Sequence, residues 1–220
     1  MLATMTDNEL QQDVLRELQW EPSVNAAHVG VAVKNGVVTL TGHVDTYAEK
    51  YAAENAAKRV LGVRAVANEL DVKLADSSKR TDQDIAIDAV NALKRNTLVP
   101  DDKIKVTVNS GWITLEGEVG WQFEKEAAES AVRYLSGVKG VVNEIRVKPR
   151  VSPADIKSKI EEALKRSAEL DAKRITVEVD GGKVILRGKV RSWAEREEAA
   201  REAWSAPGVW SVDNQIVVEP

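Results

Sequence analysis

The sequence predicts an α+β fold of three tandem αββαβ units, in which a small three-stranded sheet is covered on one face by two helices. The first observation is one motif that occurs three times, in residues 35–44, 110–119 and 181–190. In each copy two turn-forming residues precede alternating apolar residues, as in the second strand of a β-hairpin. The second observation is the spacing, because the motif's second glycine recurs after 75 and then 71 residues, at Gly42, Gly117 and Gly188. Such periodicity indicates an array of similar units.

The first element of each unit is expected to be an amphipathic helix. A capping box indicates the start of this helix, and in the first unit it is formed by Thr6 and Glu9. The other two units carry variants with aspartate in place of glutamate, Thr81 with Asp84 and Ser152 with Asp155. Pro153 also suits the first position of a helix. Apolar residues then recur four apart and form one stripe per helix: Leu10, Val14 and Leu18; Ile85, Ala89 and Leu93; Ile156, Ile160 and Leu164.

A hairpin, a second helix and a third strand complete each unit. The second strand of the hairpin points alternate apolar residues inward, with Val38, Leu40 and Val44 in the first copy. The second helix is rich in alanine, so it can pack closely on the sheet. Its expected starts are Tyr47, Gln122 and Trp193, and its expected ends lie before Gly62, Gly137 and Gly208. Because both helices cover one face, the other face of each sheet is expected to be open.

These elements divide the chain into three domains. The predicted domains are residues 6–74, 81–149 and 152–220, with linkers at 75–80 and 150–151. A domain of this size buries little more than about 60% of its extended-chain surface. Docking between domains would therefore add useful stability.

Two motifs recur in every unit. The strand motif is G-x-[VI]-x-L-x-G-x-V, and the motif after the alanine-rich helix is G-V-x-x-V-x-N, at residues 62–68, 137–143 and 208–214. With the αββαβ order, they resemble the BON domain, a family named for bacterial osmotically inducible and nodulation proteins. The resemblance covers nearly the whole chain. It implies a non-enzymatic role in phospholipid or envelope association, stress response or transport, and it supplies no catalytic residue. Asn68, Asn143 and Asn214 are expected to be structural.

Composition narrows the functional classes. A formal net charge of -4 opposes the basic footprint of a nucleic-acid-binding domain. The chain has no cysteine and two histidines, His28 and His43, and it shows no catalytic, metal-ligand or phosphate-loop pattern. We therefore expect no enzyme activity, no metal and no cofactor. No apolar run is long enough to span a bilayer.

The first residues suggest where the protein resides. They lack the basic flank and apolar core of a signal peptide, so a cytoplasmic location is expected. A removed leader would leave the same sequence, and most proteins that resemble this pattern are exported. A periplasmic or envelope location is therefore the alternative.

A predicted lipid or partner surface lies on the third unit. It consists of outward basic residues and three tryptophans: Lys183, Arg187, Lys189, Arg191, Trp193, Trp204 and Trp210. At the positions of Trp204 and Trp210 the other units carry basic residues, so these rings are not needed for the core. Trp193 lies at the start of the second helix, where every unit carries an aromatic residue. Basic side chains attract anionic lipid, and indole rings seat well at the membrane interface. The hairpin register sets Asp180 opposite Lys183 and Glu178 diagonal to Arg187, which neutralises part of this charge.

A second set of residues is predicted to mediate contacts between domains or between copies of the chain. It comprises Trp112, Glu116, Glu118, Trp121, Phe123, Tyr47 and Trp20. The outward strand of the second unit is acidic where that of the third is basic, so the two faces are complementary. Two hypotheses stay open: binding to anionic phospholipid or an envelope protein, and a self-associating scaffold or chaperone-like protein, with a homo-oligomer, that acts without lipid.

Overall fold

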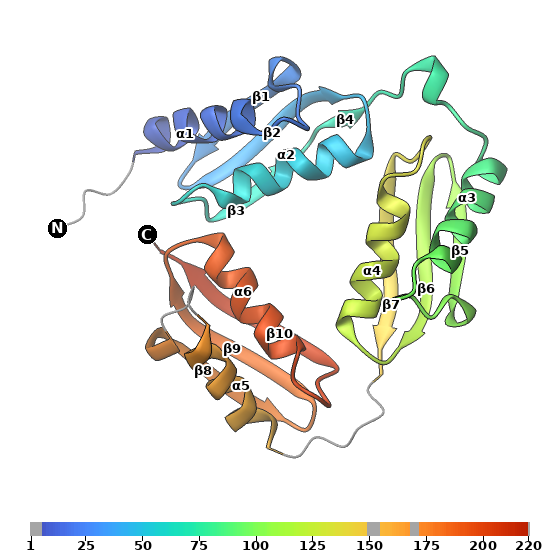
Figure 1. The fold of residues 1–220 in the computed structure, drawn as a ribbon. Helices are drawn as coiled ribbons and strands as arrows, with labels where there is room; N and C mark the ends of the chain where they lie inside the picture. The colour runs from blue at the N-terminus through green and yellow to red at the C-terminus, as the bar shows by residue number, and fades with distance from the viewer. Residues whose placement is uncertain (1–5, 149–154, 168–171, 220) are drawn as a thin grey trace. The chain divides into compact units, whose positions relative to one another are not determined.

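The computed structural model describes residues 6–148, 155–167 and 172–219 (Figure 1). Across these residues it contains three separate sheets, each accompanied by two α-helices. We refer to residues 6–74, 81–149 and 152–220 as repeats 1, 2 and 3. The predicted α+β architecture of three αββαβ units is confirmed.

The three repeats have the same order of elements. Repeat 1 consists of α1 (Asp7–Trp20), β1 (Val29–Lys34), β2 (Val37–Val44), α2 (Tyr47–Arg59), β3 (Ala65–Asn68) and β4 (Asp71–Val72). Repeat 2 consists of α3 (Asp82–Arg95), β5 (Ile104–Asn109), β6 (Trp112–Val119), α4 (Gln122–Arg133) and β7 (Gly140–Val147). Repeat 3 consists of α5 (Ile156–Arg166), β8 (Ile175–Asp180), β9 (Lys183–Val190), α6 (Trp193–Trp204) and β10 (Ser211–Val218).

Each sheet is mixed and is built around the second strand of its hairpin. In repeat 2, β6 pairs antiparallel with β5 and parallel with β7. The parallel pairing requires a crossover, which α4 provides, whereas the antiparallel pairing needs only a two-residue turn. Repeats 1 and 3 repeat this topology around β2 and β9. The third strand of repeat 1 is interrupted after Asn68, whereas β7 and β10 are continuous.

A hydrophobic core lies between each sheet and its helices. The central strands supply fully buried leucines, Leu40, Leu115 and Leu186. The predicted stripes on α1, α3 and α5 are buried, as are alanines of the second helices, such as Ala53, Ala128 and Ala199. A side chain as small as alanine allows the crossover helix to approach the sheet closely, which explains why these helices are rich in alanine.

The start of the third unit differs from the prediction. Asp155 was expected in the first turn of the helix, but it precedes α5, has a left-handed backbone (φ 57°) and makes no capping bond. The acidic capping box at this helix is therefore wrong, because Asp155 stands at the cap position itself. Its predicted partner Ser152, and Pro153, lie outside the described residues.

An aspartate in the first turn of α1 and of α3 binds the neighbouring hairpin turn. Asp7 accepts hydrogen bonds from the backbone nitrogens of Asn35 (2.7 Å) and Gly36 (3.0 Å). Asp82 accepts the same pair of bonds in repeat 2, from Ser110 (2.7 Å) and Gly111 (2.9 Å). The carboxylate thus satisfies two turn N–H groups and ties the hairpin to the first helix.

We expect Asp82→Ala to destabilise the hairpin of repeat 2. The substitution removes two hydrogen bonds to a charged acceptor at a partly exposed site, so a loss of about 1–2 kcal/mol is expected. Hydrogen exchange of the β5 and β6 amides would measure it. Asp88→Ala, at an exposed position of the same helix, is the matched control. Equal protection in the two variants would contradict this role for Asp82.

Candidate binding surfaces

The face of each sheet opposite its helices is open, and the two helices of each repeat lie on the same face (Figure 1). Outward side chains alternate with buried ones along the strands, as in the exposed–buried pattern of β9. The predicted surface residues on β6 and β9 occupy these outward positions. Their environments differ between repeats, so each open face is described separately.

The basic residues on the open face of repeat 3 are matched by acidic partners. Arg187 pairs with Glu178 and also donates to the Gln215 side chain at 3.0 Å. Lys189 contacts Glu219 at 2.7 Å. The predicted pairing of Arg187 with Glu178 is therefore observed.

The two ends of the same strand are also close to carboxylates. Lys183 lies directly opposite Asp180 in the strand register. Arg191, just beyond the strand, contacts Glu195 at 3.0 Å. Every basic residue of the predicted lipid surface thus has an acidic neighbour, and little net positive charge remains on this face.

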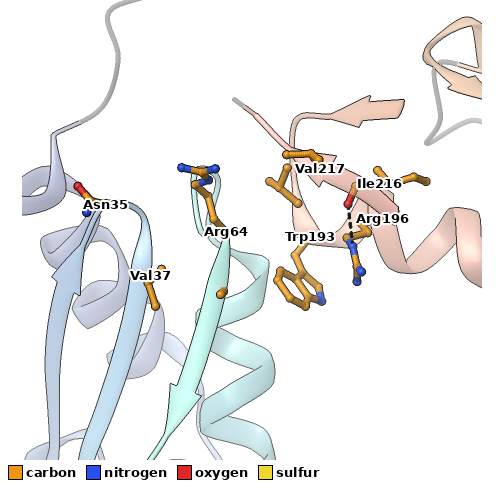
Figure 2. Close-up of a pocket in the computed structure, with 9 residues that line it drawn as sticks. Asn35, Val37, Arg64, Trp193, Arg196, Ile216 and Val217 are labelled. Atoms are coloured by element: carbon orange, nitrogen blue, oxygen red, sulfur yellow. Dashed lines mark hydrogen bonds between the residues drawn. The ribbon is translucent and has the colours of Figure 1, made fainter. Parts of the chain in front are cut away.

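The three tryptophans of repeat 3 differ in exposure. Trp193 and Trp204 are partly buried and pack against the core of their own repeat. Trp193 also donates its indole N–H to Glu197 at 2.8 Å, and the Arg196 guanidinium lies 5.1 Å from its ring centroid. Figure 2 shows Trp193 beside Arg196, whose side chain donates to the Ile216 carbonyl at 3.0 Å. These contacts give both rings a structural role.

Trp210 is the exposed ring of this group. It is 51% exposed, and its indole covers Gly182 so closely that a Cβ there would lie 2.3 Å from the ring. In repeats 1 and 2 the position of Trp210 is taken by Arg64, which lies against Gly36, and by Lys139, which lies against Gly111. Among the predicted ring residues of repeat 3, Trp210 is therefore the one most available to a partner.

In repeat 2, exposed aromatic residues gather where β6 enters α4. The rings of Trp121 and Phe123 stack with centroids 6.4 Å apart, and the side chains are 36% and 50% exposed. Glu124 holds the chain at this point by accepting from the backbone nitrogens of Gly120 (2.7 Å) and Trp121 (3.0 Å). Two apolar rings are thus exposed to solvent on a backbone segment that the Glu124 hydrogen bonds hold in place.

Basic residues flank this aromatic pair. The backbone nitrogen of Lys148 donates to the carbonyl of Val119 at 2.7 Å, which places Lys148 two residues from Trp121 in the fold. Lys148 and Arg146 share one carboxylate, Glu118, at 3.5 and 4.0 Å. Both cations are largely exposed. We call Trp121, Phe123, Arg146 and Lys148 the aromatic corner of repeat 2.

Two other predicted contact residues lie along the open face of repeat 2. Trp112 is 48% exposed, and its ring covers Gly140, where a Cβ would lie 2.3 Å from it. Glu116 lies between Lys105 and Glu144 in the strand register. The middle of this face is therefore mixed in charge, and its apolar surface is concentrated at Trp112 and at the aromatic corner.

The open face of repeat 1 carries mainly small side chains. Its outward residues on the three strands are Gly30, Ala32, Lys34, Val37, Thr39, Thr41, His43, Ala65 and Ala67. Asn35, Val37 and Arg64 lie at the hairpin end of this repeat (Figure 2). Of the predicted contact residues, Trp20 is highly exposed at the end of α1, whereas Tyr47 is half-buried.

The two histidines lie together in repeat 1. The rings of His28 and His43 stack with centroids 4.5 Å apart, because the residues face each other at one end of the β1–β2 pairing. Within the described part of the chain, no group of three or more His, Cys, Asp or Glu side chains is placed to hold a metal ion.

The recurring asparagines bind backbone and helix groups. Asn143 Nδ2 donates to the Lys125 carbonyl (2.9 Å) and to Glu129 (3.2 Å), and its Oδ1 accepts from the Ile145 nitrogen (3.3 Å). Asn68 and Asn214 make the corresponding bonds to the helix carbonyl and to the nitrogen two residues on. This amide therefore links the third strand to the crossover helix in every repeat, as expected of a structural residue.

The same network affects one carboxylate in repeat 1. Burial raises the pKa of Glu54, but hydrogen bonds from Lys58 and Asn68 lower it more, and the net pKa lies below the ordinary value. Glu54 is therefore ionised at neutral pH and stabilises the second helix against the third strand.

Sequence reasoning did not identify Asp7 and Asp82 as turn ligands, nor Arg146 and Lys148 as neighbours of the aromatic pair. The first omission had an available signal, because a Thr–Asp pair recurs at Thr6 and Thr81. The second had none in the local sequence, since Lys148 and Trp121 are brought together by the parallel pairing of β7 with β6.

These features define a tandem α+β repeat protein built from small domains with open sheet faces. None of the described helices has the length and apolar character needed to cross a membrane. The chain matches the family model of the BON domain over residues 6–73, 81–149 and 152–220, and it belongs to the BON domain family.

Individual proteins show more limited likeness. Osmotically-inducible protein Y of Escherichia coli (strain K12) is 29% identical over 150 residues, which cover 66% of this chain and 74% of that protein. Two solved structures are of CdsD, a structural protein of the type III secretion system of Chlamydia trachomatis. One covers 96% of this chain and 93% of its own at 15% identity and a TM-score of 0.27. The other, of the C-terminal domain, covers 96% and 98% at 16% identity and a TM-score of 0.26.

Proposed function

We propose that this protein is a non-enzymatic binding protein that associates with anionic phospholipid surfaces, with the aromatic corner of repeat 2 as its principal anchor. The exposed stack of Trp121 and Phe123 is the observation that carries the proposal. Membership of the BON domain family supports lipid association, and the likeness to an osmotically inducible protein supports a role in osmotic stress.

Aromatic rings supply most of the expected affinity. Indole and phenyl rings favour the zone between water and lipid headgroups, and burying one ring contributes on the order of 1–3 kcal/mol. In the aromatic corner both rings are already outside the core, so inserting them requires no unfolding. This separates them from Trp193 and Trp204, which pack against their own repeat.

Electrostatics adds a smaller contribution. Arg146 and Lys148 are exposed beside the rings and attract anionic lipid, but the carboxylates of Glu118 and Glu124 balance their formal charge, so this contribution is smaller than that of the rings. A basic residue near an anionic surface contributes about 1 kcal/mol before screening. On repeat 3, Lys183, Arg187, Lys189 and Arg191 remain proposed lipid contacts, but they must exchange their carboxylate partners for headgroups, which reduces their net contribution.

Vesicle flotation tests the proposal. We expect the protein to float with vesicles that contain phosphatidylglycerol and much less with pure phosphatidylcholine. Replacing Trp121 and Phe123 together by alanine is expected to weaken binding by about tenfold or more, because roughly 1.4 kcal/mol corresponds to a factor of ten. Lys189→Glu with Arg191→Glu is expected to have a smaller effect.

Tyr134→Ala is the matched control, because Tyr134 is an exposed aromatic residue just beyond the other end of α4. Its substitution should leave flotation unchanged. Equal recovery with both lipids, or full binding by the double alanine variant, would refute the proposal. Sedimentation that depends on protein concentration and not on lipid would instead support a self-associating scaffold, for which the open face of repeat 1, with its mainly small side chains, is the favoured surface.

A further inference from the structure

The three hairpin turns contain residue pairs that can rearrange covalently. They are Asn35-Gly36, Asn109-Ser110 and Asp180-Gly181. In such pairs the backbone nitrogen of the second residue can attack the side-chain carbonyl carbon of the first, because a small second residue leaves that nitrogen accessible. The reaction yields a cyclic succinimide. In an unstructured chain Asn-Gly reacts fastest of the three and Asp-Gly more slowly.

In repeats 1 and 2 the attacking nitrogen is held by a carboxylate. The nitrogen of Gly36 donates to Asp7 at 3.0 Å, and the nitrogen of Ser110 donates to Asp82 at 2.7 Å. The nitrogen must give up its proton as it attacks, and a hydrogen bond to an anion keeps that proton in place. The bond also ties the N–H to the first helix and so restrains the turn.

Within the described part of the chain, no carboxylate binds the turn of repeat 3. The residue that corresponds to Asp82 in the repeat register is Pro153, whose side chain cannot accept a hydrogen bond. Among the described residues no side chain accepts from the nitrogen of Gly181. The site is also open, since a Cβ built on Gly181 would have no neighbour within 4 Å.

We propose that Asp180 is a site of spontaneous isomerisation to isoaspartate, and that Asp7 and Asp82 protect the corresponding turns of repeats 1 and 2. This inference is independent of lipid binding. It reverses the order of reactivity that the three dipeptides have in an unstructured chain.

The chemistry requires only water. At Asp180 the Gly181 nitrogen bonds to Cγ, the carboxyl oxygen leaves as water, and the nitrogen loses its proton. Water then opens the ring at either carbonyl; opening at the backbone carbonyl leaves the chain running through the side-chain carbon as isoaspartate. At Asn35 or Asn109 the same attack would release ammonia, and hydrolysis would give aspartate or isoaspartate.

Isoaspartate at this position changes the hairpin itself. It inserts a methylene into the backbone of the residue that precedes the two-residue turn, and the geometry of this turn sets the register of β8 and β9. Asp180 is the last residue of β8 and pairs with Lys183, the first of β9. The modification is therefore expected to open the turn end of repeat 3, next to the proposed lipid contacts at Lys183 and Trp210.

Ageing the full-length protein tests the proposal. The protein is incubated in buffer and, in parallel, in denaturant, and peptides are mapped by mass spectrometry with an isoaspartyl methyltransferase as the probe for isoaspartate. In the folded protein we expect isoaspartate first at Asp180, with Asn35 and Asn109 intact. In denaturant we expect Asn35 to react first. Asp180→Glu should abolish the signal in repeat 3, because glutamate does not form the five-membered ring.

Two variants test the protecting role. Asp7→Ala is expected to accelerate deamidation of Asn35 several-fold while Asn109 stays intact. Asp7→Asn keeps an acceptor oxygen without the negative charge, so its rate of Asn35 deamidation should fall between those of wild type and Asp7→Ala. An intermediate rate would show that the hydrogen-bond acceptor controls the reaction and that a folding defect does not. The proposal is overturned if folded wild-type protein loses Asn35 as fast as denatured protein, or if Asp180 survives while Asn35 reacts.

Discussion

Gly117→Ala is expected to unfold the sheet of repeat 2. Gly117 has φ 151°, and a Cβ at this position would lie 2.1 Å from the carbonyl oxygen of Lys103. The clash is with backbone, so no rotamer change relieves it, and the pairing of Gly117 with Ile104 would have to break. We expect a loss of about 4 kcal/mol or more, a large part of the stability of a small domain.

Thermal or urea unfolding monitored by hydrogen exchange of repeat 2 would show this effect. Gly120→Ala is the matched control, because Gly120 lies three residues away and a Cβ there would meet only the Glu124 carboxylate, at an ordinary 3.5 Å. It should leave β5 and β6 protected. If the two variants were equally stable, steric clash with the Lys103 carbonyl would not be the reason for the second glycine of the strand motif.

The second large effect is expected for Asn143→Ala. The substitution removes the amide that joins the Lys125 carbonyl, Glu129 and the Ile145 nitrogen, and it leaves partly buried backbone groups without this partner. A buried group left unsatisfied costs about 1–3 kcal/mol, so a total loss of at least about 2 kcal/mol is expected. Urea unfolding with a probe in repeat 2 would measure it.

The asparagine variant also separates a structural role from a ligand-binding role. Asn91→Ala, at an exposed position of α3, is the control and should be nearly neutral. A ligand residue could be replaced with little change in stability but with loss of binding. An Asn143→Ala protein that kept full stability and lost vesicle binding would therefore contradict the structural assignment.

Most of the fold was predictable because its signals are local and occur three times. The stripe that contains Leu10, Val14 and Leu18, and the inward strand residue Leu40, are buried as expected. Where local signals were weak, prediction was wrong, as at Asp155, which stands before α5 instead of inside it. Ile156, the first residue of α5, belongs to the buried core of repeat 3.

The candidate site was less predictable, because its character depends on which side chains meet across strands. The cross-strand pair of Arg187 with Glu178 followed from hairpin register and was predicted. The pairing of Lys189 with Glu219 and the position of Lys148 beside the Trp121 turn join residues about 30 apart through a parallel strand. No local periodicity encodes such pairings.

The sequence alone established the α+β class, the order of elements and the resemblance to the BON domain. The spacing of apolar residues, the turn glycines and the threefold repeat were enough for this. These properties arise from interactions within a few residues, where chain geometry leaves few alternatives. Tertiary structure decided which aromatic rings pack inward and which face solvent, and which charges are neutralised. The physical reason is that burial and ion pairing depend on neighbours supplied by the crossover helix and the parallel strand, far away in the chain.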